Sequence, residues 1–189
     1  MTSQNVVGRR GATCRAYLGA HYDSVPEGPG ANDNASGTAS MLEIARVRAR
    51  DGLCVVAFGS EEVGLYGSQA FVKAHPTDGI AFTVNFDMMG RIDDAMIVGD
   101  AKLTKSILDA VQGRPNQPLR AGMFPPRASS DHVSFTAAGV PAVTVTSGDD
   151  PNIHTAGDTF EAIRPADLKT MLELGDTAIA SLARTLTTR

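Results

Sequence analysis

The chain has 189 residues, a net charge of −4, 42% hydrophobic residues and 20% charged residues. This composition is ordinary for a globular protein, and the length favours a single domain over residues 1–189 with a sizeable core. The negative net charge gives no electrostatic reason to expect nucleic acid or an anionic membrane as a partner. No apolar run approaches the roughly 20 residues that cross a bilayer, so no membrane-spanning helix is expected.

The cysteines and the N-terminal residues indicate which cellular compartment to expect. Cys14 and Cys54 are the only cysteines, and they lack the spacing of a metal-binding or redox pair. The first residues do not have the basic-then-apolar pattern of a signal peptide. We therefore expect a cytoplasmic protein with two free thiols, although a secreted protein whose export signal has been removed would have the same sequence.

The predicted elements alternate between strands and helices along the chain. Strands are expected at 5–7, 15–20, 53–58, 80–86, 96–98 and 139–146, and helices at 38–50, 64–73, 103–111, 133–138 and 165–186. The stretch 112–127 is rich in proline and glycine and is expected to be irregular, forming a wall of a substrate pocket. This order indicates a three-layer α/β/α sandwich with a mostly parallel, mixed central sheet.

Side chains that can bind metal follow several of the predicted strands. A buried apolar strand ends just before Glu61 and Glu62, whose adjacent carboxylates disfavour joint ionisation unless a cation lies nearby. His21 and Asp87 come directly after two other strands, and His154 lies in the loop after a fourth. Because the carboxyl ends of parallel strands meet at one rim of a sheet, we expect these residues to converge there.

Each candidate also has a purely structural explanation when it is taken alone. His21 is equally explained as a core histidine beside a turn-forming Asp23, and Asp33 precedes a helix, where aspartate is usually a cap. Taken together, two histidines and three carboxylates without a thiolate form a set that zinc accepts. Five protein ligands fit a pair of metals in which one carboxylate is shared between the two. The set is His21, Asp33, Glu62, Asp87 and His154.

Six blocks of the sequence resemble, in order, the co-catalytic di-zinc aminopeptidase family. They are HYDS at 21–24, GANDNASG at 30–37, GSEEVGLYGS at 59–68, NFDMMG at 85–90, SDH at 130–132 and IHTAGDT at 153–159. Six motifs in order, covering about residues 17–160, are far more specific than one motif alone. The family includes bacterial leucyl-type aminopeptidases, glutamate carboxypeptidases, glutaminyl cyclases and the transferrin-receptor ectodomain. The resemblance implies a phosphorylase/hydrolase-like α/β/α fold and two zinc ions, or other divalent ions, as cofactors.

The resemblance also implies a role for each matching ligand. Asp33 would bridge the two metals. Glu62 and His154 would hold one of them together with Asp33, and His21 and Asp87 would hold the other.

Two further side chains and one peptide bond receive roles from the same resemblance. Glu61 would be the general base, taking a proton from the water between the metals and passing it to the leaving amine. Asp23 would accept the second ring N–H of His21 and so fix its orientation. The peptide bond between Asp33 and Asn34 would be cis.

Two positions depart from the family pattern. The family often has a tyrosine just before the last histidine and an arginine before the Ser-Asp element, and Ile153 and Ser129 occupy these places. Stabilisation of the oxyanion is then expected from zinc or from a replacement such as Arg127, His132 or Tyr66. The chain is also short for the family, so we expect an open catalytic domain, unless a second copy in a homo-oligomer covers the site.

The sequence therefore predicts a zinc-dependent aminopeptidase that hydrolyses peptides with a free N-terminus. Five apolar side chains suggest a pocket for an apolar first residue, although core packing explains the same residues. They are Met88, Met89, Phe124, Phe135 and Ile153. One alternative is a single-zinc acyltransferase of the glutaminyl cyclase type, which is disfavoured because all five ligand positions are filled. The other is a catalytically inactive binding module, against which the intact Glu61 argues.

Overall fold

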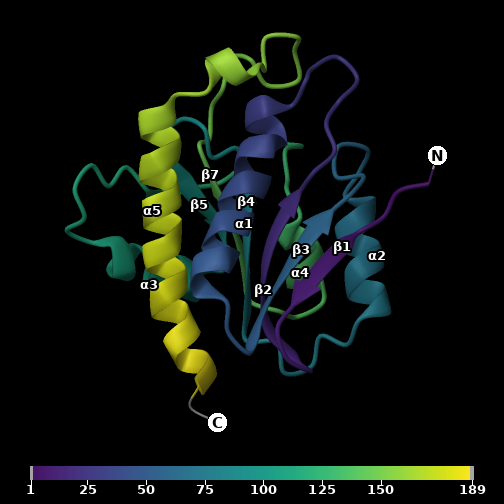
Figure 1. Ribbon diagram of the computed structural model, residues 1–189. Helices are drawn as coiled ribbons and strands as arrows, with labels where there is room; N and C mark the ends of the chain where they lie inside the picture. The colour runs from purple at the N-terminus through teal and green to yellow at the C-terminus, as the bar shows by residue number, and fades with distance from the viewer. Residues whose placement is uncertain (1, 188–189) are drawn as a thin grey trace.

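A seven-stranded mixed sheet forms the centre of the computed structural model, which describes residues 2–187 (Figure 1). The strands are β1 (Val6–Arg9), β2 (Cys14–His21), β3 (Gly52–Phe58), β4 (Phe82–Asp87), β5 (Met96–Gly99), β6 (Arg120–Ala121) and β7 (Ala142–Thr146). Their order across the sheet is β1-β3-β2-β4-β7-β5-β6. The central strands β3, β2, β4 and β7 are parallel, whereas β1 and β5 run antiparallel to their neighbours β3 and β7.

Helices cover both faces of this sheet. They are α1 (Gly37–Arg48), α2 (Tyr66–Ala74), α3 (Ala101–Val111), α4 (His132–Ala137) and α5 (Pro165–Leu182). α1, α3 and α5 pack on one face, with α1 and α5 side by side in front of the sheet in Figure 1, and α2 and α4 pack on the other. The predicted three-layer α/β/α sandwich with a mostly parallel mixed sheet is therefore confirmed.

The core is divided by the sheet, because successive side chains on a strand point to opposite faces. On β2, Leu18 packs with the buried residues of α1, α3 and α5. Its neighbour Tyr17 lies on the other face, where its ring meets Phe71 of α2 edge-on at 5.2 Å between centroids and also contacts Phe135 of α4. β2 is therefore packed on both faces, and its last residue is His21.

Element boundaries agree with the predicted ones to within a few residues, with three differences. The irregular stretch 112–127 contains the short strand β6, which pairs with β5. The last predicted helix stops at Leu182 and continues as a 3-10 turn, Ala183–Thr187. A separate irregular turn, Ala31–Ser36 (η1), precedes α1. This turn is the one that matters for the site, because it carries Asp33.

The expectation of two free thiols was wrong, because Cys14 and Cys54 form a disulfide. The two residues lie on the adjacent strands β2 and β3, with their Cα atoms 5.5 Å apart, which is a normal separation for a bridged pair. The sequence did not show this proximity, because 40 positions separate the two cysteines and the pairing of β2 with β3 brings them together. Within residues 2–187 the structure has no helix long and apolar enough to cross a membrane.

Candidate metal centre

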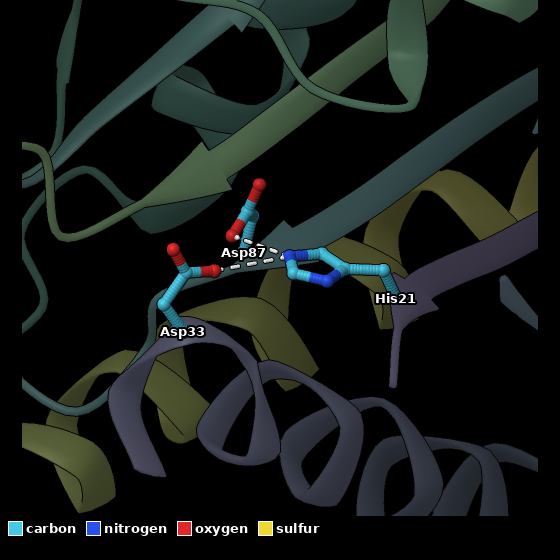
Figure 2. Close-up of side chains that lie close together, drawn as sticks. All are labelled: His21, Asp33 and Asp87. Atoms are coloured by element: carbon cyan, nitrogen blue, oxygen red, sulfur yellow. Dashed lines mark ion pairs between the residues drawn. The ribbon is translucent and has the colours of Figure 1, made fainter. Parts of the chain in front are cut away.

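Two of the predicted ligands end neighbouring parallel strands. His21 is the last residue of β2 and Asp87 is the last residue of β4. Their side chains meet above the rim of the sheet, with His21 Nε2 3.4 Å from Asp87 Oδ1. Both residues are almost fully buried. Figure 2 shows the imidazole of His21 pointing toward Asp87 and Asp33.

Asp33 reaches this cluster from the turn η1 and faces two histidines. Its Oδ1 atom lies 3.1 Å from His21 Nε2, and its Oδ2 atom lies 3.1 Å from His154 Nε2 (the first of these contacts is drawn in Figure 2). Asp33 is not a helix cap, because the residue before α1 is Ser36. The Asp33–Asn34 peptide bond is cis, as the family resemblance implied. Asp33 is therefore the side chain through which the two histidines are connected.

Glu62 and His154 complete the cluster on the other side of Asp33. Glu62 Oε2 lies 3.0 Å from His154 Nε2. His154 comes from the loop after β7 and its side chain is half exposed, so this side of the cluster opens to solvent. The five side chains form two groups of three that share Asp33, and in each group the potential ligand atoms lie within 4.8 Å of one another.

The chemistry of this cluster fits a pair of divalent cations. Burial, and then the charge of neighbouring Asp33, raises the pKa of Glu62 to about 7. Burial also raises the pKa of Glu61 to about 9, and the carboxylates of Asp87 and Asp131 add to this effect. Glu62 Oε1 is buried without a hydrogen-bond partner in the described part of the chain. A cation in each group of three would satisfy such oxygens and offset the repulsion, and the mixed nitrogen and oxygen donors suit a zinc-type ion.

Asp23 connects His21 to the strand end that carries the two glutamates. The Nδ1 atom of His21 lies 3.1 Å from the backbone carbonyl of Asp23 and 3.7 Å from its carboxylate, so the carbonyl is the nearer acceptor. The carboxylate of Asp23 accepts the backbone N–H groups of Glu61 at 3.1 Å and Glu62 at 3.3 Å. Asp23 thus holds the main chain of the glutamates as well as facing the ring of His21.

Three residues to which the sequence assigned no role, Ser130, Asn85 and Asp158, hold the ligands in place. Ser130 Oγ donates a 2.5 Å hydrogen bond to Asp87 Oδ2, and it accepts one of 2.8 Å from Asn85 Nδ2. The carboxylate of Asp158 accepts backbone N–H groups of the turn that carries Asp33. Ser130, Asn85 and Asp158 all lie inside the six motif blocks, which was the available signal for them.

A cleft of about 700 Å³ opens over the cluster. Of the five apolar residues for which a pocket or the core was considered, Met88, Phe124 and Ile153 line the cleft. Met89 and Phe135 do not, because both are buried in the core with at most 1% exposure. Met96 and Met123 contribute to the walls instead.

One of the three residues considered for the oxyanion lies on the wall of the cleft. Arg127 is exposed and lines it. Neither His132 nor Tyr66 is among the lining residues. His132 is buried, with Nδ1 2.8 Å from Thr144 Oγ1, and Tyr66 is 62% exposed. Among the described residues that line the cleft, Arg127 is the one arginine or lysine, so its guanidinium group is available to a ligand there.

Several known proteins are similar to this chain in sequence. Aminopeptidase YwaD from Bacillus subtilis strain 168 is 32% identical, over 96% of this chain and 44% of its own length. Probable lipoprotein aminopeptidase LpqL from Mycobacterium tuberculosis is 33% identical, over 77% of this chain and 38% of its own. The chain thus spans less than half the length of these two relatives.

Solved structures of aminopeptidases are similar to this chain in fold. The structure of BSAP, a zinc aminopeptidase from B. subtilis, superposes with a TM-score of 0.80 at 29% identity, covering 94% of this chain and 49% of that one. A glutaminyl cyclase from Bacteroides thetaiotaomicron has a TM-score of 0.77 over 94% of this chain and 77% of its own, but at 20% identity it shows only a shared fold. Residues 5–178 match the profile of Peptidase family M28. The family resemblance is confirmed, and the chain belongs to peptidase family M28.

Proposed function

We propose that residues 1–189 form the catalytic domain of a zinc-dependent aminopeptidase that removes N-terminal residues from peptides. The observation that carries the proposal is the convergence of two groups of ligand-competent side chains on a shared Asp33, where they line a cleft. Membership of peptidase family M28, and relatives and structures described as aminopeptidases, support it. The compared proteins are longer, so the activity of the whole enzyme is part of this proposal.

The five clustered side chains are the proposed ligands. His21 and Asp87 would hold one zinc ion and Glu62 and His154 the other, with Asp33 contributing one oxygen to each. When bound, the two ions would lower the pKa of a water between them and polarise the scissile carbonyl.

Glu61 is the proposed general base. Its backbone is fixed by the carboxylate of Asp23, and among residues 2–187 its own carboxylate has no hydrogen-bond or ion-pair partner. An unligated carboxylate beside the cluster can accept a proton from the attacking water and deliver it to the nitrogen of the leaving peptide. Arg127 on the cleft wall would stabilise the oxygen that becomes negative in the transition state.

The cleft also indicates the substrate class. The carboxylates around the cluster, such as Glu61 and Asp87, suit a free α-ammonium group, which fits an exopeptidase that acts at the N-terminus. The apolar walls favour an apolar side chain on the first residue. They are formed by Met88, Met96, Met123, Phe124 and Ile153.

The disulfide bears on where the enzyme works. Structural disulfides persist in oxidising compartments and are rare in the cytosol. The bond between Cys14 and Cys54 therefore favours the secreted alternative over the cytoplasmic one.

Metal content and substrate turnover test the proposal together. We expect two zinc ions per chain after the chelated protein is reconstituted. Leucyl-, methionyl- and phenylalanyl-nitroanilides should be hydrolysed faster than the glutamyl compound, with loss of activity on chelation and recovery with zinc. One zinc per chain with cyclisation of glutaminyl peptides would instead indicate an acyltransferase. Two bound ions without turnover of any substrate would indicate a binding module.

A further inference from the structure

We propose that Asp158 is a positioning residue that fixes the main chain of Asp33 and thereby sets the affinity of both metal sites. The inference rests on the proposed function, because it assigns Asp33 to both ions. Asp158 is 2% exposed and lies in the loop after β7. Among the described residues it makes no hydrogen bond or ion pair with a ligand side chain, so it can act on the metals through the backbone that it holds.

Three consecutive N–H groups of the turn η1 are directed at Asp158. Its Oδ1 atom accepts from Asn32 N at 2.7 Å, and its Oδ2 atom accepts from Asp33 N at 3.0 Å. Its backbone carbonyl accepts from Ala31 N at 3.1 Å. Both oxygens of the carboxylate are needed as acceptors, and hydrogen bonds to a carboxylate are stronger than neutral ones. The turn is therefore anchored at the residue that carries the shared ligand and at the two residues before it.

The other side of the turn is held by different contacts. Asn32 Nδ2 donates to Asp150 Oδ2 at 2.7 Å, and Asn32 Oδ1 accepts from Gly90 N at 2.8 Å. Asn34 Oδ1 accepts from Met88 N at 3.0 Å, which ties the turn to the residue after Asp87. None of these contacts involves the backbone N–H of Asp33, whose acceptor is Asp158. Removing one acceptor oxygen from Asp158 would leave either this N–H or that of Asn32 without its acceptor in a buried place.

Asp158 also connects the loop that carries His154 to the turn that carries Asp33. It follows His154 by four residues, and Asp158 N donates to Thr155 O at 3.2 Å within the same loop. The loop thus meets Asp33 twice, at its side chain through His154 Nε2 at 3.1 Å and at its backbone through Asp158. Because the two oxygens of Asp33 face different histidines, a rotation of its backbone would misplace both. Loss of Asp158 should therefore weaken both sites, whereas loss of His154 should remove a ligand from one.

The experiment is zinc titration calorimetry on metal-free protein, with thermal unfolding of the same samples. Asp158→Asn replaces one acceptor oxygen with an NH₂ group, which cannot accept an N–H. We expect the Kd of both zinc sites to rise about 10- to 100-fold, as is typical when a partner that orients a ligand is lost. His154→Ala should weaken only one site. Asp176→Asn removes a carboxylate that pairs with Arg48 between α5 and α1, so it should lower stability while leaving both zinc affinities unchanged.

Wild-type zinc affinities in a folded Asp158→Asn protein would overturn the inference, and so would a loss confined to one site. If this variant is partly unfolded without metal, the zinc dependence of its urea midpoint gives the same affinities, because zinc that binds the folded state stabilises it by mass action. A wild-type protein that takes up no zinc would contradict the proposed function. A wild-type protein that binds two ions, beside an unaffected variant, would contradict only the role of Asp158.

Discussion

Glu62 Oε2 lies 3.0 Å from His154 Nε2, on the side of the cluster that opens to solvent. Glu61, one residue earlier, has no such contact, and its carboxylate lines the cleft without a hydrogen-bond or ion-pair partner in the described part of the chain. Both backbones are held by one carboxylate, that of Asp23. Adjacent side chains diverge, so the same strand end can provide a metal ligand and a free base.

This difference predicts opposite results for two conservative substitutions. Glu61→Gln keeps the size of the side chain and removes its basicity, so it should retain two zinc ions per chain while kcat falls by at least about 10²-fold. Glu62→Gln should instead weaken the uptake of one ion. Metal analysis and nitroanilide kinetics on both proteins check this. Metal loss in Glu61→Gln, or near-normal turnover with both ions bound, would contradict the assignment of the base.

The disulfide should contribute strongly to stability. It closes a loop of 40 residues between the adjacent strands β2 and β3, and in the chain-entropy account a loop of this size stabilises the folded state by about 4 kcal/mol. Urea unfolding of the oxidised and reduced protein should show a loss of this order. The double variant Cys14→Ala, Cys54→Ala should start from the lower stability and be insensitive to reductant. Equal midpoints for oxidised and reduced wild-type protein would contradict the prediction.

The disulfide also illustrates what the sequence could not predict. Strand and helix positions followed from local apolar patterns, and the layers followed from their alternation. The bridge required knowing that β2 and β3 are neighbours, which depends on the whole fold rather than on either cysteine. The sequence left two explanations open for Met89 and Phe135 for a similar reason, because a large apolar side chain in a site motif is as well suited to the core as to a cleft, and the structure places both in the core.

The ligand cluster was more predictable than the contacts that support it. Carboxylates and histidines at strand ends converge because parallel strands share a rim, so the pattern alone predicted that His21 and Asp87 gather there, and the family resemblance supplied their grouping. The supporting bonds of Ser130 and Asp158 depend on loop conformations, and a serine or aspartate in a loop has many local explanations. The motif resemblance included these residues but did not indicate which atoms they contact.

Arg127 should act mainly on the transition state. It is exposed on the cleft wall and has no hydrogen-bond or ion-pair partner among residues 2–187, so its guanidinium group is available to a developing oxyanion. Arg127→Ala should lower kcat by about 10²- to 10³-fold with little change in KM. Arg114→Ala, which removes an arginine that donates to Thr177 on α5, is the matched control and should leave both constants unchanged. A rise in KM with an unaltered kcat would instead assign Arg127 to substrate binding.

His132 should make the metal-free protein sensitive to acid. Burial lowers the pKa of His132 to about 4, against the opposing charge of Asp87, and its side chain is buried beside Phe124 and Thr144. In the unfolded chain a histidine titrates near 6.5, so between these two values the unfolded state binds a proton that the folded state does not. The contribution of the neutral His132 ring to the free energy of unfolding is therefore fully present above about pH 6.5. It decreases as the pH falls toward 4, by at most about 1.4 kcal/mol per pH unit.

Urea unfolding of metal-free wild-type protein and His132→Gln between pH 7.5 and 4 isolates this contribution. The carboxylates of the cluster titrate in both proteins, so their effect cancels in the difference between the two curves. Glutamine cannot gain a proton on unfolding, so the variant should lose less stability on acidification. The free energy of unfolding of the variant relative to wild type should rise by up to about 3 kcal/mol from pH 7 to pH 4. Parallel curves across this range would mean that His132 is protonated as readily in the folded protein as in the unfolded chain, and that the buried ring is not held neutral.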